Sequence, residues 1–185
     1  MSSSLPLNPA EPDIQTEDRA IVVHKVGAES IPVIQSLAKI TWEVVYKEIL
    51  SEAQLIYMLE LIYSSDSLQH QIEELGHQFI LVTVEEKEAG FASYSRKNEN
   101  ACTIYILHKI YIDPNHHGKG IGKILLNYIV DDIIPAGAKS LELNVNRHNK
   151  ALGFYKKSGF EIIDEQDIPI GRGYFMNDYI MKLSW

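Results

Sequence analysis

The chain has 185 residues, a formal net charge of −8 and hydrophobic residues at 45% of its positions. These values are typical of one globular domain with a sizeable core. The acidic balance argues against a nucleic-acid partner, which needs a basic surface. No apolar run approaches the roughly 18 residues that span a bilayer, which argues against a membrane partner.

The first 18 residues are rich in Ser and Pro, and they lack the basic start and apolar stretch of a signal peptide. We therefore expect a disordered tail at residues 1–18, a single domain at residues 19–185 and a cytoplasmic protein. Cys102 is the only cysteine, so an intrachain disulfide is excluded.

Hydrophobic spacing predicts the secondary structure in chain order. We expect strands at residues 20–26, 78–84, 89–96, 101–113, 140–145, 160–164 and 174–183. We expect helices at residues 30–50, 52–62, from 65 or 66 to about 76, 121–134 and 149–158. This order predicts an α/β fold, with a central mixed and mostly antiparallel sheet flanked by helices.

A glycine-rich turn, residues 117–123 (HGKGIGK), links the long third antiparallel strand to a helix. Glycines allow positive φ and close approach of a ligand to the backbone. A helix N-terminus presents unpaired N–H groups and the positive end of a dipole, and Lys119 and Lys123 add positive charge. The pattern predicts a phosphate-binding turn, although such a turn can also simply cap a helix.

Two other phosphate-binding motifs do not fit the same residues. A Walker A loop needs Ser or Thr after the lysine, but Ile124 follows Lys123. A dinucleotide-binding fingerprint needs Gly-x-Gly-x-x-Gly in a parallel strand–helix–strand unit, whereas these glycines have the spacing Gly-x-Gly-x-Gly after antiparallel strands.

The glycine turn resembles the acyl-CoA-binding motif of the GNAT superfamily of N-acetyltransferases, Gln/Arg-x-x-Gly-x-Gly/Ala. His117 stands at the Gln/Arg position, which is a departure, and Gly120 and Gly122 occupy the two small positions. The resemblance implies a GNAT fold with splayed central strands that hold acyl-CoA. The acyl-CoA-binding residues implied by the resemblance are Ile110, Tyr111, Ile112, His117, Gly118, Lys119, Gly120, Ile121, Gly122, Lys123 and Asn149.

A second segment, residues 146–160, is similar to the family signature Asn-x-x-Ala-x-x-x-Tyr-x-x-x-Gly-Phe. His148 falls where the signature has its CoA-contacting Asn, so Asn149 is the candidate for that role. The resemblance makes Tyr155 the general acid that protonates the leaving thiolate. An aromatic on the core face of a helix is the alternative for Tyr155.

An amine must lose a proton before it attacks a thioester, which calls for a general base. His108 precedes Ile110 in the strand before the turn, where alternation predicts that His108, Ile110 and Ile112 share one face. Glu142 on the next strand is the second candidate. No carboxylate has ligand spacing with the histidines, so we expect no metal.

In this family the acceptor pocket lies between the early helices and the last strands. The aromatic candidates for its lining are Trp42, Tyr46, Tyr94, Tyr174 and Phe175. The chain resembles the PaiA-type polyamine acetyltransferases over most of its length. We therefore expect acetyl transfer from acetyl-CoA to a primary amine of a polyamine-like small molecule. The alternatives are a peptide or protein N-α-acetyltransferase and a catalytically silent acyl-CoA-binding regulatory module, and a homodimer is compatible with the family.

Overall fold

The computed structural model describes residues 20–98, 100 and 103–185. The predicted tail and Cys102 lie outside the described residues. The strands are β1 (Ile21–Val26), β2 (Gln78–Val84), β3 (Lys87–Arg96), β4 (Ile104–Ile112), β5 (Ser140–Asn146), β6 (Glu161–Gly171) and β7 (Tyr174–Ser184). The helices are α1 (Ile31–Val45), α2 (Glu52–Tyr63), α3 (Ser65–Glu73), α4 (Ile121–Ile133) and α5 (Leu152–Lys157), with short 3-10 turns η1 (Ala28–Ser30) and η3 (Pro114–His116).

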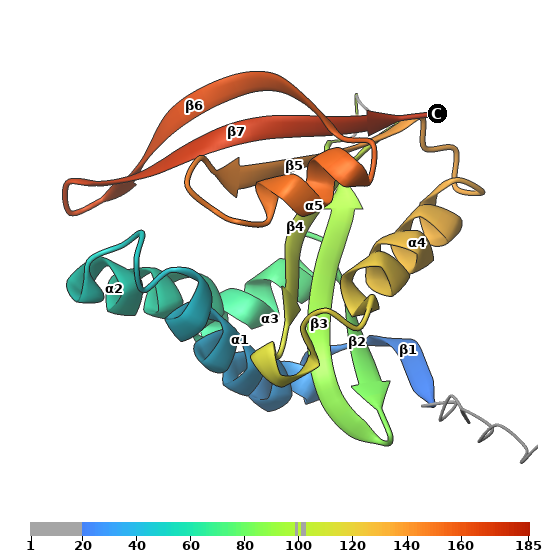
Figure 1. Ribbon diagram of the computed structural model, residues 1–185, viewed down its shortest axis with the longest axis horizontal. Coiled ribbons are helices and arrows are strands. Elements are labelled where there is room, and N and C mark those ends of the chain that lie inside the picture. The colour runs from blue at the N-terminus through green and yellow to red at the C-terminus, as the bar shows by residue number, and fades with distance from the viewer. Residues whose placement is uncertain (1–19, 99, 101–102) are drawn as a thin grey trace, which may run out of the picture.

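The seven strands form one sheet in the order β1-β2-β3-β4-β5-β7-β6. Only β4 and β5 pair in parallel, and every other neighbouring pair is antiparallel. Helices α1, α2 and α3 lie on one side of the sheet and α4 on the other (Figure 1). The predicted α/β fold with a mixed, mostly antiparallel sheet is confirmed.

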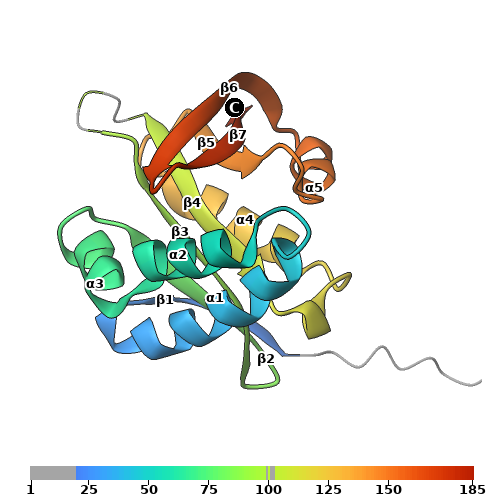
Figure 2. The same ribbon diagram turned by 90° about the vertical axis from the view of Figure 1, so that its left-hand side faces the viewer.

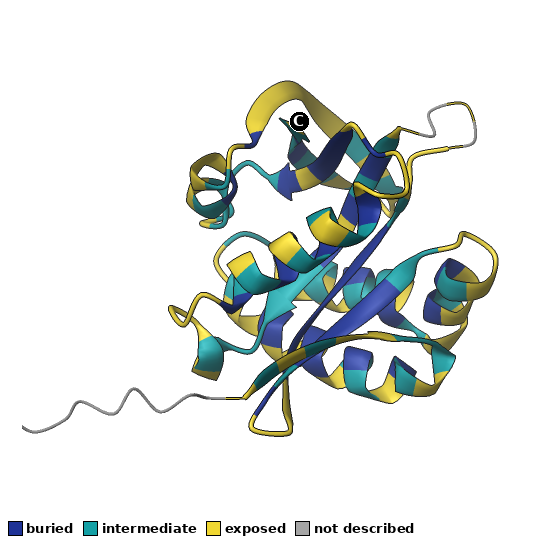
Figure 3. Cartoon of the chain, turned by 90° about the vertical axis from the view of Figure 1, so that its right-hand side faces the viewer, coloured by how far each residue is buried: buried dark blue, intermediate teal, exposed yellow. Residues whose placement is uncertain are grey.

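Two buried clusters hold these layers together, one on each side of the sheet. Helix α1 buries Ile34, Leu37, Ala38, Thr41 and Trp42, at the three- and four-residue spacing that places side chains on one helix face. These side chains pack with Phe79 and other residues on one face of β2 and β3. On the opposite face, α4 packs against the strands, so that the central strands are buried from both sides (Figure 3).

The hairpin of β6 and β7 is longer than the sequence predicts, because β6 runs to Gly171 rather than ending at Asp164. As an edge strand it is exposed on both faces, so it has no hydrophobic alternation to reveal it. The hairpin reaches over α2 (Figure 2), where the Tyr57 hydroxyl donates to the Ile170 carbonyl at 2.7 Å. This contact joins the β6–β7 hairpin to α2.

Two predicted helices are shorter in the structure. Helix α1 ends at Val45, five residues before the expected end. Helix α5 begins at Leu152 instead of Asn149, because Asn149 Oδ1 accepts the N–H of Ala151 at 2.8 Å and forms a turn. The N-cap predicted at Ser51 is present, since its Oγ accepts the N–H of Gln54 at 3.2 Å.

Strands β4 and β5 separate halfway along their length. Their pairing covers Ile104 to Leu107 against Ser140 to Leu143, whereas β4 continues to Ile112 and β5 to Asn146. The splayed central strands expected from the family resemblance are therefore present. Beyond the point of divergence, backbone groups of β4 face a space instead of another strand.

Candidate active site

A large cleft of about 1220 Å³ occupies the space between the diverging strands. It exceeds the roughly 300–1,000 Å³ of ordinary small-ligand pockets, as a long ligand requires. Its walls include the ends of β4 and β5, the glycine turn, the first turn of α4 and the start of α5. Most of the predicted site residues line it: His108, Ile110, Tyr111, Ile112, His117, Gly118, Gly120, Ile121, Gly122, Lys123, Asn149 and Tyr155.

The glycine turn has the backbone geometry of an anion site. Gly118 and Gly120 have φ of +75° and +77°, and a Cβ at either position would meet no atom within 4 Å. Both therefore border open space, and glycine is favoured for its backbone angle. Among the described residues, no backbone carbonyl accepts the N–H groups of residues 118–122 at the start of α4. These donors and the helix dipole suit a phosphate group.

Some side chains of the turn form hydrogen bonds to neighbouring backbone carbonyls, and some line the cleft. The Nε2–H of His117 donates to the Ile112 carbonyl at 2.9 Å, which ties the turn to the end of β4. Lys119 Nζ donates to the Asn115 carbonyl at 2.8 Å, and its side chain does not line the cleft. Lys123 lines the cleft. The histidine thus holds the turn in place, and the groups left available for an anion are backbone N–H groups and Lys123.

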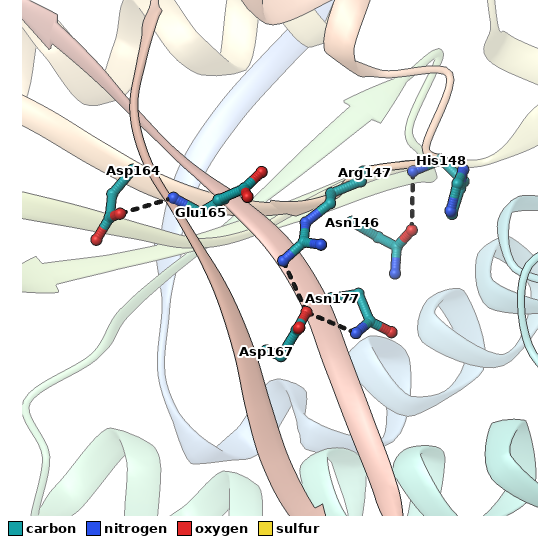
Figure 4. Close-up of polar contacts among 7 residues, drawn as sticks. All are labelled: Asn146, Arg147, His148, Asp164, Glu165, Asp167 and Asn177. Atoms are coloured by element: carbon teal, nitrogen blue, oxygen red, sulfur yellow. Dashed lines mark hydrogen bonds and ion pairs between the residues drawn. The ribbon is translucent and has the colours of Figure 1, made fainter.

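The loop after β5 closes the other side of the cleft. Asn146 Oδ1 accepts the backbone N–H of His148 at 3.0 Å, which shapes this loop (Figure 4). Asn149 Oδ1 accepts the N–H of Ala151 at 2.8 Å, and the Asn149 side chain acts to lower the pKa of Tyr46 at the end of α1. Asn149 and Tyr46 both line the cleft.

Tyr155 lies on α5 with 7% of its surface exposed, yet it lines the cleft. Its ring contacts the rings of Phe154 and Phe160 at centroid distances of 5.3 and 5.7 Å. Burial, followed by the charge of Tyr46, raises the pKa of the Tyr155 phenol, so the hydroxyl keeps its proton at neutral pH. The ring packs in the core, as the alternative interpretation expects, and the residue also borders the cleft, so the general-acid role stays a prediction.

The predicted common face of His108, Ile110 and Ile112 is wrong. A β-bulge opposite Ser93 and Tyr94 inserts one residue into β4, which interrupts the alternation. The Ile110 and Ile112 side chains pack with the cluster around α4. His108 instead turns to the other side, where Ser95 Oγ lies 2.8 Å from its Nε2 and its ring stacks on His77 with centroids 3.8 Å apart.

His108 faces the cleft but is a weak base there. Desolvation by the surrounding protein, followed by the electrostatic effect of His77 and Lys109, lowers the pKa of His108 to about 3, although part of the side chain is open to the cleft. A general base works best with a pKa near the operating pH. The neutral imidazole therefore has little affinity for a proton taken from an amine.

Glu142 does not reach the cleft. This side chain is buried, and its two oxygens bind Lys97 Nζ at 2.7 Å and Lys182 Nζ at 3.6 Å. Residues lining the cleft come from the following part of β5, beginning at Leu143. The structure thus separates this candidate base from the other predicted site residues.

A second cavity of about 210 Å³ adjoins the large cleft. Tyr46, His108, Lys109, Tyr111 and Asn144 line both spaces. The second cavity lies between α1, α2 and the strands β4, β5 and β7, where the family resemblance places the acceptor.

Three of the five predicted aromatic lining residues, Trp42, Tyr46 and Phe175, border the second cavity. Tyr94 and Tyr174 do not. The Tyr94 hydroxyl donates to Asp132 Oδ2 at 2.7 Å on the α4 side of the sheet, and Tyr174 packs on Tyr57 with ring centroids 5.7 Å apart.

Sequence reasoning missed two charged residues of the second cavity, Lys109 and Asp178. Both are buried, with 7% and 2% of their surfaces exposed. Burial lowers the pKa of Lys109 to about 8 and raises the pKa of Asp178 to about 6, the latter against the opposing effect of Arg147 and a hydrogen bond from Asn144. A charged residue inside an otherwise apolar strand is the signal that could have identified them.

Within the part of the chain that the structure describes, no group of three or more His, Cys, Asp or Glu side chains is arranged to hold a metal ion. Within the same residues, no helix has the length and apolar character needed to cross a membrane.

Comparison with known proteins identifies the class. The acetyltransferase (GNAT) domain family matches residues 47–171. Peptidyl-lysine N-acetyltransferase YjaB of Salmonella typhimurium is 29% identical over 121 residues, which cover 60% of this chain and 74% of that relative.

Two solved structures share the fold. PaiA N-acetyltransferase from Thermoplasma acidophilum, in complex with coenzyme A, has a TM-score of 0.75 and 23% identity, covering 90% of this chain and 99% of the other. The ribosomal-protein-S18-alanine N-acetyltransferase from Escherichia coli has a TM-score of 0.67 and 18% identity, covering 89% and 94% of the two chains.

The chain therefore belongs to the GNAT acetyltransferase family, whose model matches more than half of its length. It is an acetyl-CoA-dependent N-acetyltransferase, as the glycine turn and the second signature predicted.

Proposed function

We propose that this enzyme transfers acetyl from acetyl-CoA to a primary amine of a small, polyamine-like molecule by direct attack of the amine on the thioester. The observation that carries the proposal is the junction of the two spaces. A large cleft bordered by an anion-binding turn opens beside a small cavity that contains a carboxylate and aromatic rings. The first space suits the cofactor and the second suits a cationic amine.

The glycine turn would hold the pyrophosphate of acetyl-CoA. Backbone N–H groups at residues 118–122 would donate to phosphate oxygens, and Lys123 would add charge. The end of β4 from Ile110 to Ile112, which pairs with β3 but no longer with β5, would offer hydrogen bonds to the pantetheine arm from its free edge. Asn149 would position this arm from the opposite wall.

Tyr155 would act as the general acid. Its neutral hydroxyl can protonate the thiolate that leaves when the amine attacks, and a proton donor of this kind contributes about 10²- to 10⁴-fold to the rate. The aromatic packing of the ring against Phe154 and Phe160 would fix the position of that hydroxyl.

A turnover assay that detects free thiol tests the proposal across polyamines, amino acids, aminoglycosides and short peptides. We expect thiol release that depends on a polyamine and falls at least tenfold in Tyr155→Phe, with unchanged acetyl-CoA binding. Tyr128→Phe is the matched control, because Tyr128 packs beside the α4 cluster and lines neither space. Release with none of the amines would refute the acceptor class, and absence of acetyl-CoA binding would refute the role of the turn.

A peptide or protein amine is the second candidate acceptor. The YjaB relative is named for a peptidyl lysine, and the Escherichia coli neighbour is named for an alanine of a ribosomal protein. The same assay separates the two candidates. If a peptide or protein amine is the acceptor, acetyl-CoA will release thiol faster with short peptides than with polyamines.

A further inference from the structure

Asp178 is a buried carboxylate without an ion-pair partner. Its side chain borders the second cavity from β7 with 2% of its surface exposed. Asn144 lies close enough to lower its pKa, and no lysine, arginine or histidine of the described residues forms an ion pair with it. Buried charges are normally paired, so this carboxylate has an open place for a cation.

The nearest arginine is held by another carboxylate. Arg147 Nη2 donates to Asp167 Oδ1 at 2.7 Å, and Asn177 Nδ2 donates to the same oxygen at 2.7 Å (Figure 4). The guanidinium also lies 5.9 Å from the centre of the Tyr179 ring. Asp167 therefore holds the Arg147 guanidinium toward β6, and Arg147 acts on Asp178 through its charge without forming an ion pair with it.

The lysine of the second cavity is also occupied. Lys109 Nζ donates to Gln71 Oε1 at 2.5 Å. It lies 5.8 and 5.5 Å from the ring centres of Tyr63 and Phe79. Its ammonium is thus directed toward α3 and these rings, so it does not neutralise Asp178.

Aromatic rings surround the space in front of Asp178. Trp42 lies at the centre of this group, with its ring centroid 4.5 Å from Tyr46, 5.5 Å from Tyr63 and 6.0 Å from Tyr111. All four residues line the second cavity. Ring faces attract cations electrostatically, and they do so more strongly where water is excluded.

The volume of the second cavity limits the size of the ligand. At roughly 30 Å³ per water molecule, a space of about 210 Å³ holds on the order of seven waters. The end of an unbranched alkylamine fits such a space.

We propose that Asp178 binds the acceptor's ammonium group in the second cavity and accepts a proton from it before attack. This role rests on the proposed acetyl transfer. The ammonium loses one proton to the Asp178 carboxylate, and the nitrogen lone pair forms the bond to the thioester carbonyl carbon. The carbon–sulfur bond then breaks, the thiolate takes the Tyr155 proton, and a second nitrogen proton restores the phenol. Asp178 releases its proton to solvent.

The position of Asp178 makes it a better base than the two candidates from sequence. Its carboxyl borders the cavity, unlike Glu142, and its pKa of about 6 lies close to neutral pH, unlike that of His108. The other titratable or charged groups facing this cavity or Asp178 are Tyr46, Tyr63, His108, Lys109, Tyr111 and Arg147.

The test compares Asp178→Asn with wild-type enzyme, using 1,4-diaminobutane as acceptor between pH 5 and 8. We expect wild-type kcat/KM to rise with pH through an apparent pKa near 6. In Asp178→Asn we expect that limb to disappear and kcat/KM to fall about 10²-fold or more, with unchanged acetyl-CoA affinity. Asp164→Asn is the matched control, since this exposed β6 carboxylate accepts from Glu165 N (Figure 4) and from Gln166 Nε2, and it lines neither space. An Asp178→Asn profile that keeps the limb, or a loss below threefold, would overturn the assignment.

Calorimetric titration of 1,4-diaminobutane into the coenzyme A complex tests the binding step without turnover. We expect at least tenfold weaker binding in Asp178→Asn than in wild type. Equal binding by the two proteins would overturn the ammonium site. A wild-type enzyme that binds acetyl-CoA but acetylates no amine, while Asp178→Asn still loses diamine binding, would refute the proposed transfer and the base role but retain the ammonium site.

Discussion

The backbone at Gly120 offers a test of the phosphate-binding turn that needs no knowledge of the acceptor. Gly120 is the N-cap of α4 with φ of +77°, and a Cβ there would border only open space. In Gly120→Ala the left-handed backbone costs about 1–2 kcal/mol of stability. For a chain of this length that lowers Tm by about 2–8 °C. The methyl group would also stand where the pyrophosphate approaches the backbone.

Gly137→Ala separates strain from binding. Gly137 follows α4 with φ of +91°, again with no atom within 4 Å of an added Cβ, and it lines neither space. We expect both variants to lose similar Tm in differential scanning calorimetry. Loss of a charge-assisted hydrogen bond costs about 1.5–3 kcal/mol, so only Gly120→Ala should weaken acetyl-CoA binding, by about 10- to 150-fold in Kd. Wild-type affinity in a folded Gly120→Ala would refute the reasoning.

Three further predictions concern side chains around the site. Glu142→Gln should lower the free energy of unfolding by about 1–3 kcal/mol in urea titrations, because it removes a charge bound to two lysines, yet leave turnover within about twofold. Because the pKa of His108 is lowered in the folded protein, the unfolded chain binds more protons than the folded chain below pH 6.5, and the free energy of unfolding falls as pH drops towards 3. His108→Gln removes this effect, so it should show a smaller loss of Tm than wild type between pH 7 and 4.5. Tyr57→Phe removes the bond to Ile170 and should cost about 1 kcal/mol while acetyl-CoA affinity, measured by calorimetry, stays unchanged.

Hydrophobic periodicity was sufficient to locate an element wherever one face of that element is buried. Helix α4 buries Ile121, Leu125 and Ile129, which are spaced four residues apart. The predicted helix differs from the observed one by a single residue at its C-terminal end. Strand β6 has no such face, so its second half escaped prediction. A polar edge strand is recognised by its pairing with a neighbour, here β7, and that pairing leaves no pattern within the residues of β6 itself.

The glycine turn could be predicted because its chemistry is local. Positive φ at Gly118 and Gly120, and free N–H groups at the start of α4, depend on consecutive residues and on the rules of helix ends. For the same reason the family resemblance could be drawn from two short motifs.

The charged and titratable groups of the acceptor side were decided by tertiary structure. One inserted residue in β4 reversed the side on which His108 lies, because strand alternation has a period of two. The environment of Asp178 depends on its burial beside Asn144, on the hydrogen bond that holds Arg147 to Asp167, and on rings contributed by α1, α2 and β4. Sequence determined the class of enzyme and the glycine turn through short-range backbone geometry. The environment of the candidate base depends on contacts of β7 with segments as distant in the chain as α1 and α2, which only the folded chain brings together.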